Sequence, residues 1–176
     1  MIKKPVYLLL LLAGIALLPA CKKNDAKKEV QIDATNLTAC RPGETCTYTF
    51  TDHADVDSTF AIRGGQYRLF WSRQQLSANT TGLYVRAPLC NTSFELGKAD
   101  ILAGKVTWVF SCPACYSIPY VAVGGYVKGV NTTPNKPADQ SVWLLEAQIL
   151  LSTTTDSPIQ DTIKVKQYFS PGFVLN

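Results

Sequence analysis

The sequence is poor in the residue types and motifs from which most catalytic sites are built. It contains one histidine, His53, so a site made of several histidines is excluded and any catalytic triad would have to include this residue. The chain lacks a glycine-rich phosphate loop, a nucleophile elbow and a metal-hydrolase signature. An enzyme built on a carboxylate pair such as Asp55 and Asp57 stays open, because such pairs form in space and not in sequence.

Helical periodicity is also nearly absent after residue 29. Short runs rich in Val, Ile, Thr, Tyr and Phe are separated by Gly, Pro, Asn and Asp, which is typical of half-buried strands. The pattern predicts a single all-β domain over residues 30–176, an antiparallel β-sandwich or a partly closed barrel. The expected strands are 30–34, 45–51, 59–63, 66–72, 82–87, 93–96, 105–111, 120–130, 141–152 and 161–169.

Glycine pairs mark two irregularities in this pattern. Gly64 and Gly65 lie between two expected strands and predict a tight hairpin, because glycine readily adopts the positive φ of such turns. Gly124 and Gly125 interrupt an apolar run and predict a bulge or a bend. A single helical turn is expected between residues 96 and 104.

The first residues of the chain have the three zones of a secretion signal. A basic head with Lys3 and Lys4 precedes an apolar run over residues 6–18, which ends at Pro19-Ala20. A membrane-spanning helix needs about 20 apolar residues, so this run is too short to cross a bilayer. The pattern predicts a removable signal peptide over residues 1–20, either of the ordinary kind or of the kind that precedes a lipidated cysteine.

Leu18-Pro19-Ala20-Cys21 resembles the lipobox of bacterial lipoproteins, although Pro19 stands where Ala or Ser is commoner. The resemblance implies cleavage before Cys21 and a covalent lipid on its sulfur, with no other cofactor expected. Residues 21–29 are then a polar tether. The segment that starts at Cys21 also looks like that of many Bacteroidota lipoproteins. Lys22, in place of Asp, favours the outer membrane by analogy with lipoprotein sorting, with the periplasmic and the surface face both open.

The charge distribution argues against nucleic acid as a partner. Six of the 17 basic residues lie before residue 30 but only two of the 13 acidic residues do, so residues 30–176 carry 11 of each. A nucleic-acid-binding domain needs a basic face of its own, and this domain is neutral.

Five cysteines remain after Cys21. Cys40 and Cys46 flank a Pro-Gly turn, and an oxidising compartment predicts that they form a disulfide. Cys112 and Cys115 have three interpretations: a structural bridge within the pair or to Cys90, a redox-active dithiol, or a zinc site shared with Cys40 and Cys46. The residues that follow Cys115 favour strand, whereas a thioredoxin-like site requires a helix there.

Two further groups could bind a ligand. Asp52, Asp55 and Asp57 lie within six residues and could hold Ca²⁺, or they could belong to a solvated loop between strands. Tyr67 and Trp71 share a strand face and, with Tyr84, could form a platform for sugar rings, or they could fill the core.

These features predict a non-catalytic binding or accessory lipoprotein of the cell envelope, with a glycan or a polypeptide as partner. The alternative is an envelope redox or metal-binding protein that uses Cys112 and Cys115.

Overall fold

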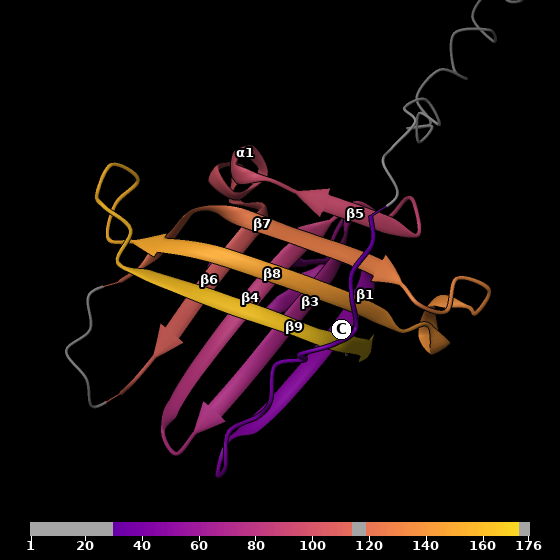
Figure 1. Cartoon of the computed structure of the whole chain (residues 1–176), viewed down its shortest axis with the longest axis horizontal. Helices are drawn as coiled ribbons and strands as arrows, with labels where there is room; N and C mark the ends of the chain where they lie inside the picture. Colours follow the sequence, from indigo (N-terminus) through magenta and orange to yellow (C-terminus); the bar gives the residue numbers. More distant parts are fainter. Residues whose placement is uncertain (1–29, 114–118, 173–176) are drawn as a thin grey trace, which may run out of the picture.

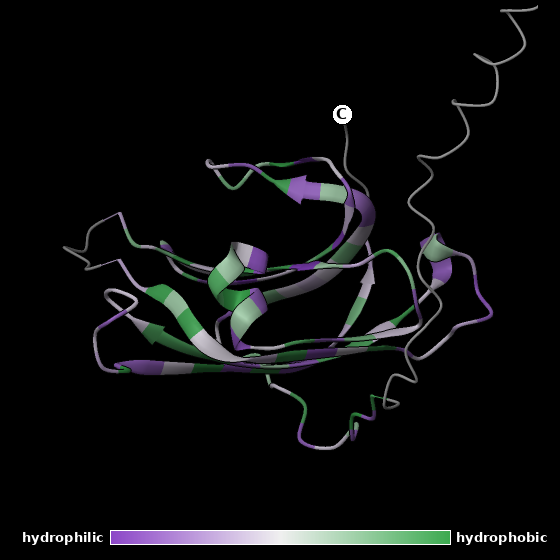
Figure 2. Ribbon diagram, turned by 90° about the horizontal axis from the view of Figure 1, so that it is seen from above, coloured by the Kyte–Doolittle hydropathy of each residue, from purple (hydrophilic) through white to green (hydrophobic). Residues whose placement is uncertain are grey.

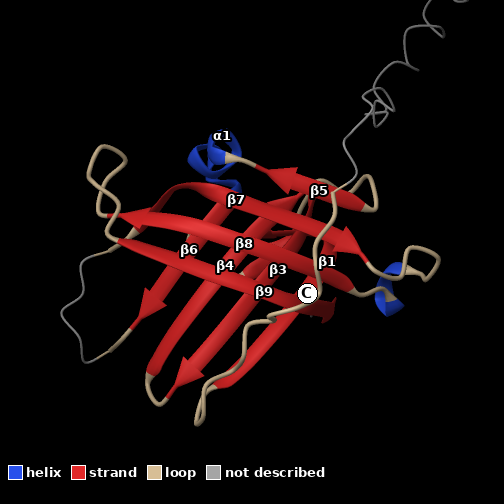
Figure 3. Ribbon diagram, viewed as in Figure 1, coloured by secondary structure: helices blue, strands red, loops and turns tan. Residues whose placement is uncertain are grey.

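The computed structural model describes residues 30–113 and 119–172, which form an all-β domain (Figures 1 and 3). The predicted signal peptide, Cys21 and Cys115 lie outside the described residues. The strands are β1 (Thr45–Val56), β2 (Ile62–Gly64), β3 (Tyr67–Leu76), β4 (Asn79–Ala87), β5 (Ser93–Leu96), β6 (Val106–Ser111), β7 (Val121–Asn131), β8 (Trp143–Ser152) and β9 (Asp161–Pro171). The helical segments are α1 (Lys98–Asp100), the irregular turn Ile101–Lys105 that follows it, and a 3₁₀ turn at Ala138–Gln140. None of these described helical segments is long and apolar enough to cross a membrane.

The strands form one curled sheet, in the order β5-β7-β8-β9-β1-β3-β4-β6, with β2 paired beside β1. All pairs are antiparallel except β1 and β9, which run parallel and meet at Thr49–Ser170 and Phe50–Pro171. The two halves of the sheet cross in Figure 1 and lie one above the other in Figure 2, so that the sheet forms a half-barrel. The all-β prediction is confirmed, and two separate antiparallel sheets packed as a sandwich are not.

The hydrophobic core lies between the two halves of the sheet. Successive side chains of a strand point to opposite faces, so alternate residues of each strand meet in the interior. The largest fully buried side chains come from both halves: Phe50, Phe70, Phe94, Trp143 and Phe169. Their rings pack edge-on or tilted, with centroids 5.4–6.4 Å apart. Each such side chain contributes about 1.5–3 kcal/mol on burial, so this aromatic cluster holds the two halves together.

The hairpin predicted at Gly64-Gly65 is wrong. β2 and β3 do not pair with each other, and both pair with β1, where Ala54 lies opposite Gly64 and Tyr67. The chain reverses earlier, over residues 57–61. A Cβ atom on Gly65 would lie 2.6 Å from Cβ of Asp55, so this glycine is required by close backbone approach and not by turn geometry.

Other local predictions are confirmed. The register between β7 and β8 shifts between Ala122 and Gly124, and Gly125 has a φ of +108°, so a bulge lies at the predicted glycine pair. The helical turn α1 lies within the predicted range, and the irregular turn that follows it ends one residue beyond that range, at Lys105. The prediction of a strand at residues 30–34 is wrong, because this segment has no regular structure.

Candidate ligand-binding cleft

A cleft of about 450 Å³ opens at one end of the half-barrel. Its floor is the inner face of β3, β4 and β6, and its opposite wall is the beginning of β9. Residues 36–44, which we name the strap, close one side. The volume is within the range of about 300–1,000 Å³ that is usual for small-ligand sites.

The floor of the cleft continues the inner face of the sheet beyond the core. On β3, the core residue Phe70 is followed on the same face by Ser72, Gln74 and Leu76. On β4, Thr81 precedes Leu83 on the same face. The alternation of strands is therefore preserved, while the side chains, apart from Leu76, change from apolar to amide and hydroxyl groups that can both donate and accept hydrogen bonds.

β6 supplies the aromatic part of the lining. Trp108 is half-buried and packs against the core on one side while it lines the cleft on the other. Phe110, two residues further on, is 44% exposed, as is Leu76. Apolar side chains of this size at the mouth of a cleft are available for a ligand, because the core does not use them.

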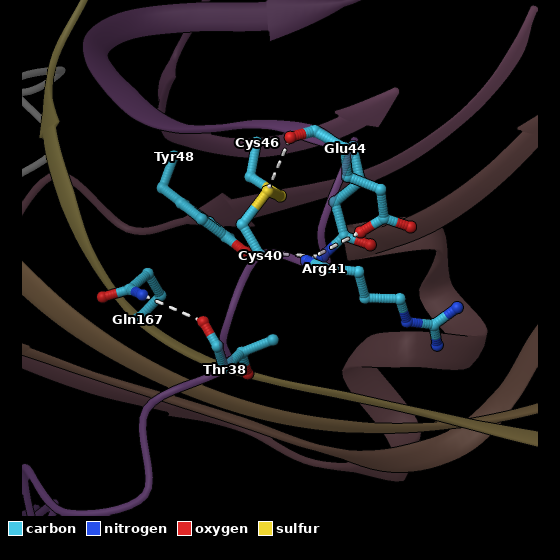
Figure 4. Close-up of a disulfide and its surroundings, with 8 residues drawn as sticks. Thr38, Cys40, Arg41, Glu44, Cys46, Tyr48 and Gln167 are labelled. Carbon is cyan, nitrogen blue, oxygen red and sulfur yellow. Dashed lines mark hydrogen bonds between the residues drawn. A yellow bond between two sulfur atoms is a disulfide. The ribbon is translucent and has the colours of Figure 1, made fainter. Parts of the chain in front are cut away.

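The strap is fixed to the domain by a disulfide and by hydrogen bonds (Figure 4). Cys40 and Cys46 are bonded, with their Cα atoms 5.9 Å apart. The backbone N–H of Glu44 donates to the carbonyl of Arg41 at 3.0 Å, which closes the predicted turn. Gly43 has a φ of +82° in this turn, as glycine readily allows. The predicted disulfide is thus confirmed, and it holds one wall of the cleft.

The charged side chains that line the cleft balance in sign. Arg41 and Lys164 are basic, and Glu44 and Asp161 are acidic. Among the described residues, no ion pair includes any of these four side chains. The cleft therefore offers both signs of charge to a ligand and has no net preference for a polyanion.

The predicted aromatic platform lies on the opposite, outer face of the sheet. Trp71 and Tyr84 are direct cross-strand partners, and they pack with Leu69, which is fully buried. Phe60, from the β1–β2 turn, stacks on Tyr84 with ring centroids 5.9 Å apart. Burial raises the pKa of Tyr84 above its usual range. The structure brings Trp71 and Tyr84 together, but largely as a second small core.

Tyr67, the third member of the predicted platform, pairs with Ala54 of β1. Its hydroxyl accepts a long hydrogen bond of 3.4 Å from the side chain of Gln66.

The three predicted calcium ligands each have an arginine partner. The distances from carboxylate oxygen to guanidinium nitrogen are 2.5 Å for Asp52–Arg68, 2.5 Å for Asp55–Arg86 and 2.7 Å for Asp57–Arg63. The Thr59 hydroxyl and then Arg63 hold the pKa of the Asp57 carboxyl far below its usual range. These carboxylates are not gathered around one point; in the described part of the chain, the three ligating groups that lie close together are those of Cys40, Glu44 and Cys46.

The disulfide makes Cys40 and Cys46 unsuitable for zinc, because zinc binds thiolates and both sulfurs are already bonded to each other. The zinc interpretation of the four cysteines is therefore wrong. Cys90 and Cys112 are also disulfide-bonded, so neither offers a free thiol. Cys115 lies outside the described residues.

Comparisons of the chain with protein-family models, with curated proteins and with solved structures found no match.

The cleft was not among the sites predicted from the sequence. Its lining combines β6 with the start of β9, about 50 residues further along the chain, and only the curl of the sheet brings them together. One local signal was present in the sequence. Trp108 and Phe110 lie two residues apart and so share one face of their strand, whereas the polar Thr107 lies on the other face.

Proposed function

We propose that the chain is a lipid-anchored lipoprotein of the outer membrane, and that its β domain is a non-catalytic module that binds a glycan or a polypeptide in the cleft. The single observation that carries the binding role is the lining of the cleft. The exposed ring of Phe110 and the half-buried ring of Trp108, both on β6, lie beside amide and hydroxyl groups of β3 and β4.

The position of the cleft relative to the anchor supports the proposal. The described chain begins near β5 and β1, whereas β6 ends and β9 begins on the other side of the molecule (Figure 1). A domain tethered through residues 21–29 therefore holds its cleft away from the point of attachment. A ligand could reach the cleft without entering the space between domain and bilayer.

Two tryptophans on opposite faces of the sheet allow a direct test. The full-length protein, purified in detergent, is applied to an array of glycans and to an array of short peptides. We expect that Trp108→Ala abolishes binding of any ligand found, and that Trp71→Ala, which alters the outer face, leaves binding intact. Loss of binding in Trp71→Ala alone would mean that the ligand binds on the outer face, at Trp71 and Tyr84, and not in the cleft.

A further inference from the structure

The wall of the cleft formed by β9 is a strand edge and not a strand face. Five consecutive residues, Asp161 to Val165, line the cleft, although successive side chains of a strand point to opposite faces. One edge of β9 pairs with β8 along its length. The other edge pairs with β1 only from Ser170 onward, so the first half of β9 has an edge that β1 does not cover.

The even-numbered residues of β9 direct their backbone groups toward this second edge. The carbonyl of Lys166 accepts from the backbone N–H of Thr38 at 2.7 Å, and its own N–H donates to the Thr38 hydroxyl at 2.8 Å. Gly172 donates to the carbonyl of Phe50 on β1 at 2.7 Å. Since the register with β8 is regular, Lys164 and Thr162 have the same orientation.

Lys164 is the position at which this edge is open. The N–H of Thr162 donates to the neighbouring Asp161 carboxylate at 2.7 Å. The backbone groups of Lys166 are bonded to Thr38. Within residues 30–113 and 119–172, neither β1 nor the strap is bonded to the N–H and C=O of Lys164. Such an edge is a template for another extended chain, and this one faces the cleft.

We propose that the cleft binds an extended polypeptide segment, which pairs with the open edge of β9 at Lys164. This inference rests on the proposed binding role of the cleft and specifies its ligand. The strap already makes the first step of such pairing through Thr38, and the ligand continues it toward the start of β9. Main-chain hydrogen bonds supply affinity in this mode of recognition, and pockets for alternate side chains supply specificity.

The lining matches the side chains of such a segment. Residues of the bound segment that point into the cleft meet Leu76, Trp108 and Phe110, so apolar side chains are favoured at these positions of the segment. The charged side chains of Lys164 and Asp161, of opposite sign, lie near the open backbone groups of Lys164. A segment with both an acidic and a basic residue is therefore complementary. A sugar chain could stack on the same rings, but it has no ladder of N–H and C=O groups to pair with the edge.

The experiment removes one backbone donor without removing a side-chain contact of the fold. The full-length protein in detergent is applied to an array of eight-residue peptides with alternating apolar residues and mixed charges. Lys164→Pro deletes the open N–H, to which neither β1 nor the strap is bonded, and proline is tolerated at sheet edges. Lys164→Gln is the matched control, because it removes the charge and keeps the N–H. Circular dichroism establishes that both variants are folded.

We expect a binding peptide whose Kd weakens about tenfold or more in Lys164→Pro and changes much less in Lys164→Gln. As a second measurement on the unaltered protein, methylation of alternate backbone nitrogens in that peptide abolishes its binding. Peptide binding that survives both changes would overturn strand pairing at β9. A glycan that binds through Trp108, with no peptide bound, overturns this inference and leaves the proposed function standing; no ligand of either class overturns both.

Discussion

Arg68 and Asp52 form a two-pronged ion pair beside the aromatic core. The Nε and Nη2 atoms of Arg68 lie 2.5 and 2.8 Å from the two oxygens of Asp52. The same guanidinium lies 4.4 Å from the centre of the Trp143 ring. The side chain of Arg68 is only 11% exposed, so its charge depends on these two neighbours for compensation.

Removal of the Asp52 carboxylate is therefore expected to cost much more than removal of an exposed ion-pair partner. Asp52→Ala leaves the Arg68 charge nearly buried, and we expect the free energy of unfolding to fall by about 2–3 kcal/mol. Arg63→Ala is the control, because the side chain of Arg63 is 69% exposed in its pair with Asp57. Its effect is expected to be much smaller, because solvent screens an exposed pair. Urea denaturation measures both, and equal losses would contradict the importance of burial.

Acid sensitivity is predicted from Glu146 on the outer face of β8. The Tyr126 hydroxyl donates to Glu146 at 2.6 Å, and Lys166 lies 3.3 Å away. The Tyr126 hydrogen bond, and then Lys166, lower the pKa of Glu146 below its ordinary value of 4.5. A lowered pKa in the folded state means stability that is present above pH 4.5 and lost as the pH falls through the folded pKa.

Tyr126→Phe tests this linkage. We expect it to lower the free energy of unfolding by about 1 kcal/mol at neutral pH, and to have less effect in acid, where Glu146 is protonated in both states. Denaturation curves across the acidic range measure the difference. Tyr168→Phe, at an exposed tyrosine of β9, is the control. A Tyr126→Phe effect that does not change with pH would argue against the role of Glu146.

The Cys40–Cys46 disulfide is expected to stabilise both the domain and the cleft. Closing so short a loop contributes about 2.4 kcal/mol through the entropy of the unfolded chain. The double variant Cys40→Ala/Cys46→Ala should lose about that amount in urea denaturation. Because the strap is a wall of the cleft, ligand binding should weaken as well. If the variant binds as tightly as the native chain, the strap is not part of the site.

Local alternation of residues predicted most of the fold. β5 was expected at 93–96 and has those bounds, and most other strands lie within a few residues of their expected ends. The failures have local causes. Gly64 and Gly65 look like a hairpin, but the Asp57 carboxylate accepts from the N–H groups of Thr59 and Ala61 and fixes the chain reversal before them. A glycine needed for close approach cannot be distinguished in sequence from one needed for a turn.

The cleft could not be predicted because it depends on long-range pairing. The parallel contact between Phe50 and Pro171 turns the sheet back on itself and places β9 opposite β6. Only two residue pairs make this contact, and parallel pairing leaves no turn signal in the sequence. The disulfide of the strap was predictable, because Pro42 and Gly43 indicate the turn locally, but its place beside the cleft was not.

The proposed anchor predicts that Cys21 alone determines membrane attachment. Acyl chains contribute about 0.8 kcal/mol for each buried CH₂, so two or three long chains hold a protein of this size permanently. Cys21→Ser removes their attachment point. We expect the native chain to incorporate radiolabelled palmitate and to sediment with the outer membrane, and the variant to do neither. Lys22→Ala is the control, because it keeps the cysteine; it should remain lipidated wherever it is sorted. A Cys21→Ser protein that still sediments with membranes would mean that attachment uses another part of the chain, and that residues 21–29 do not set the orientation of the cleft relative to the bilayer.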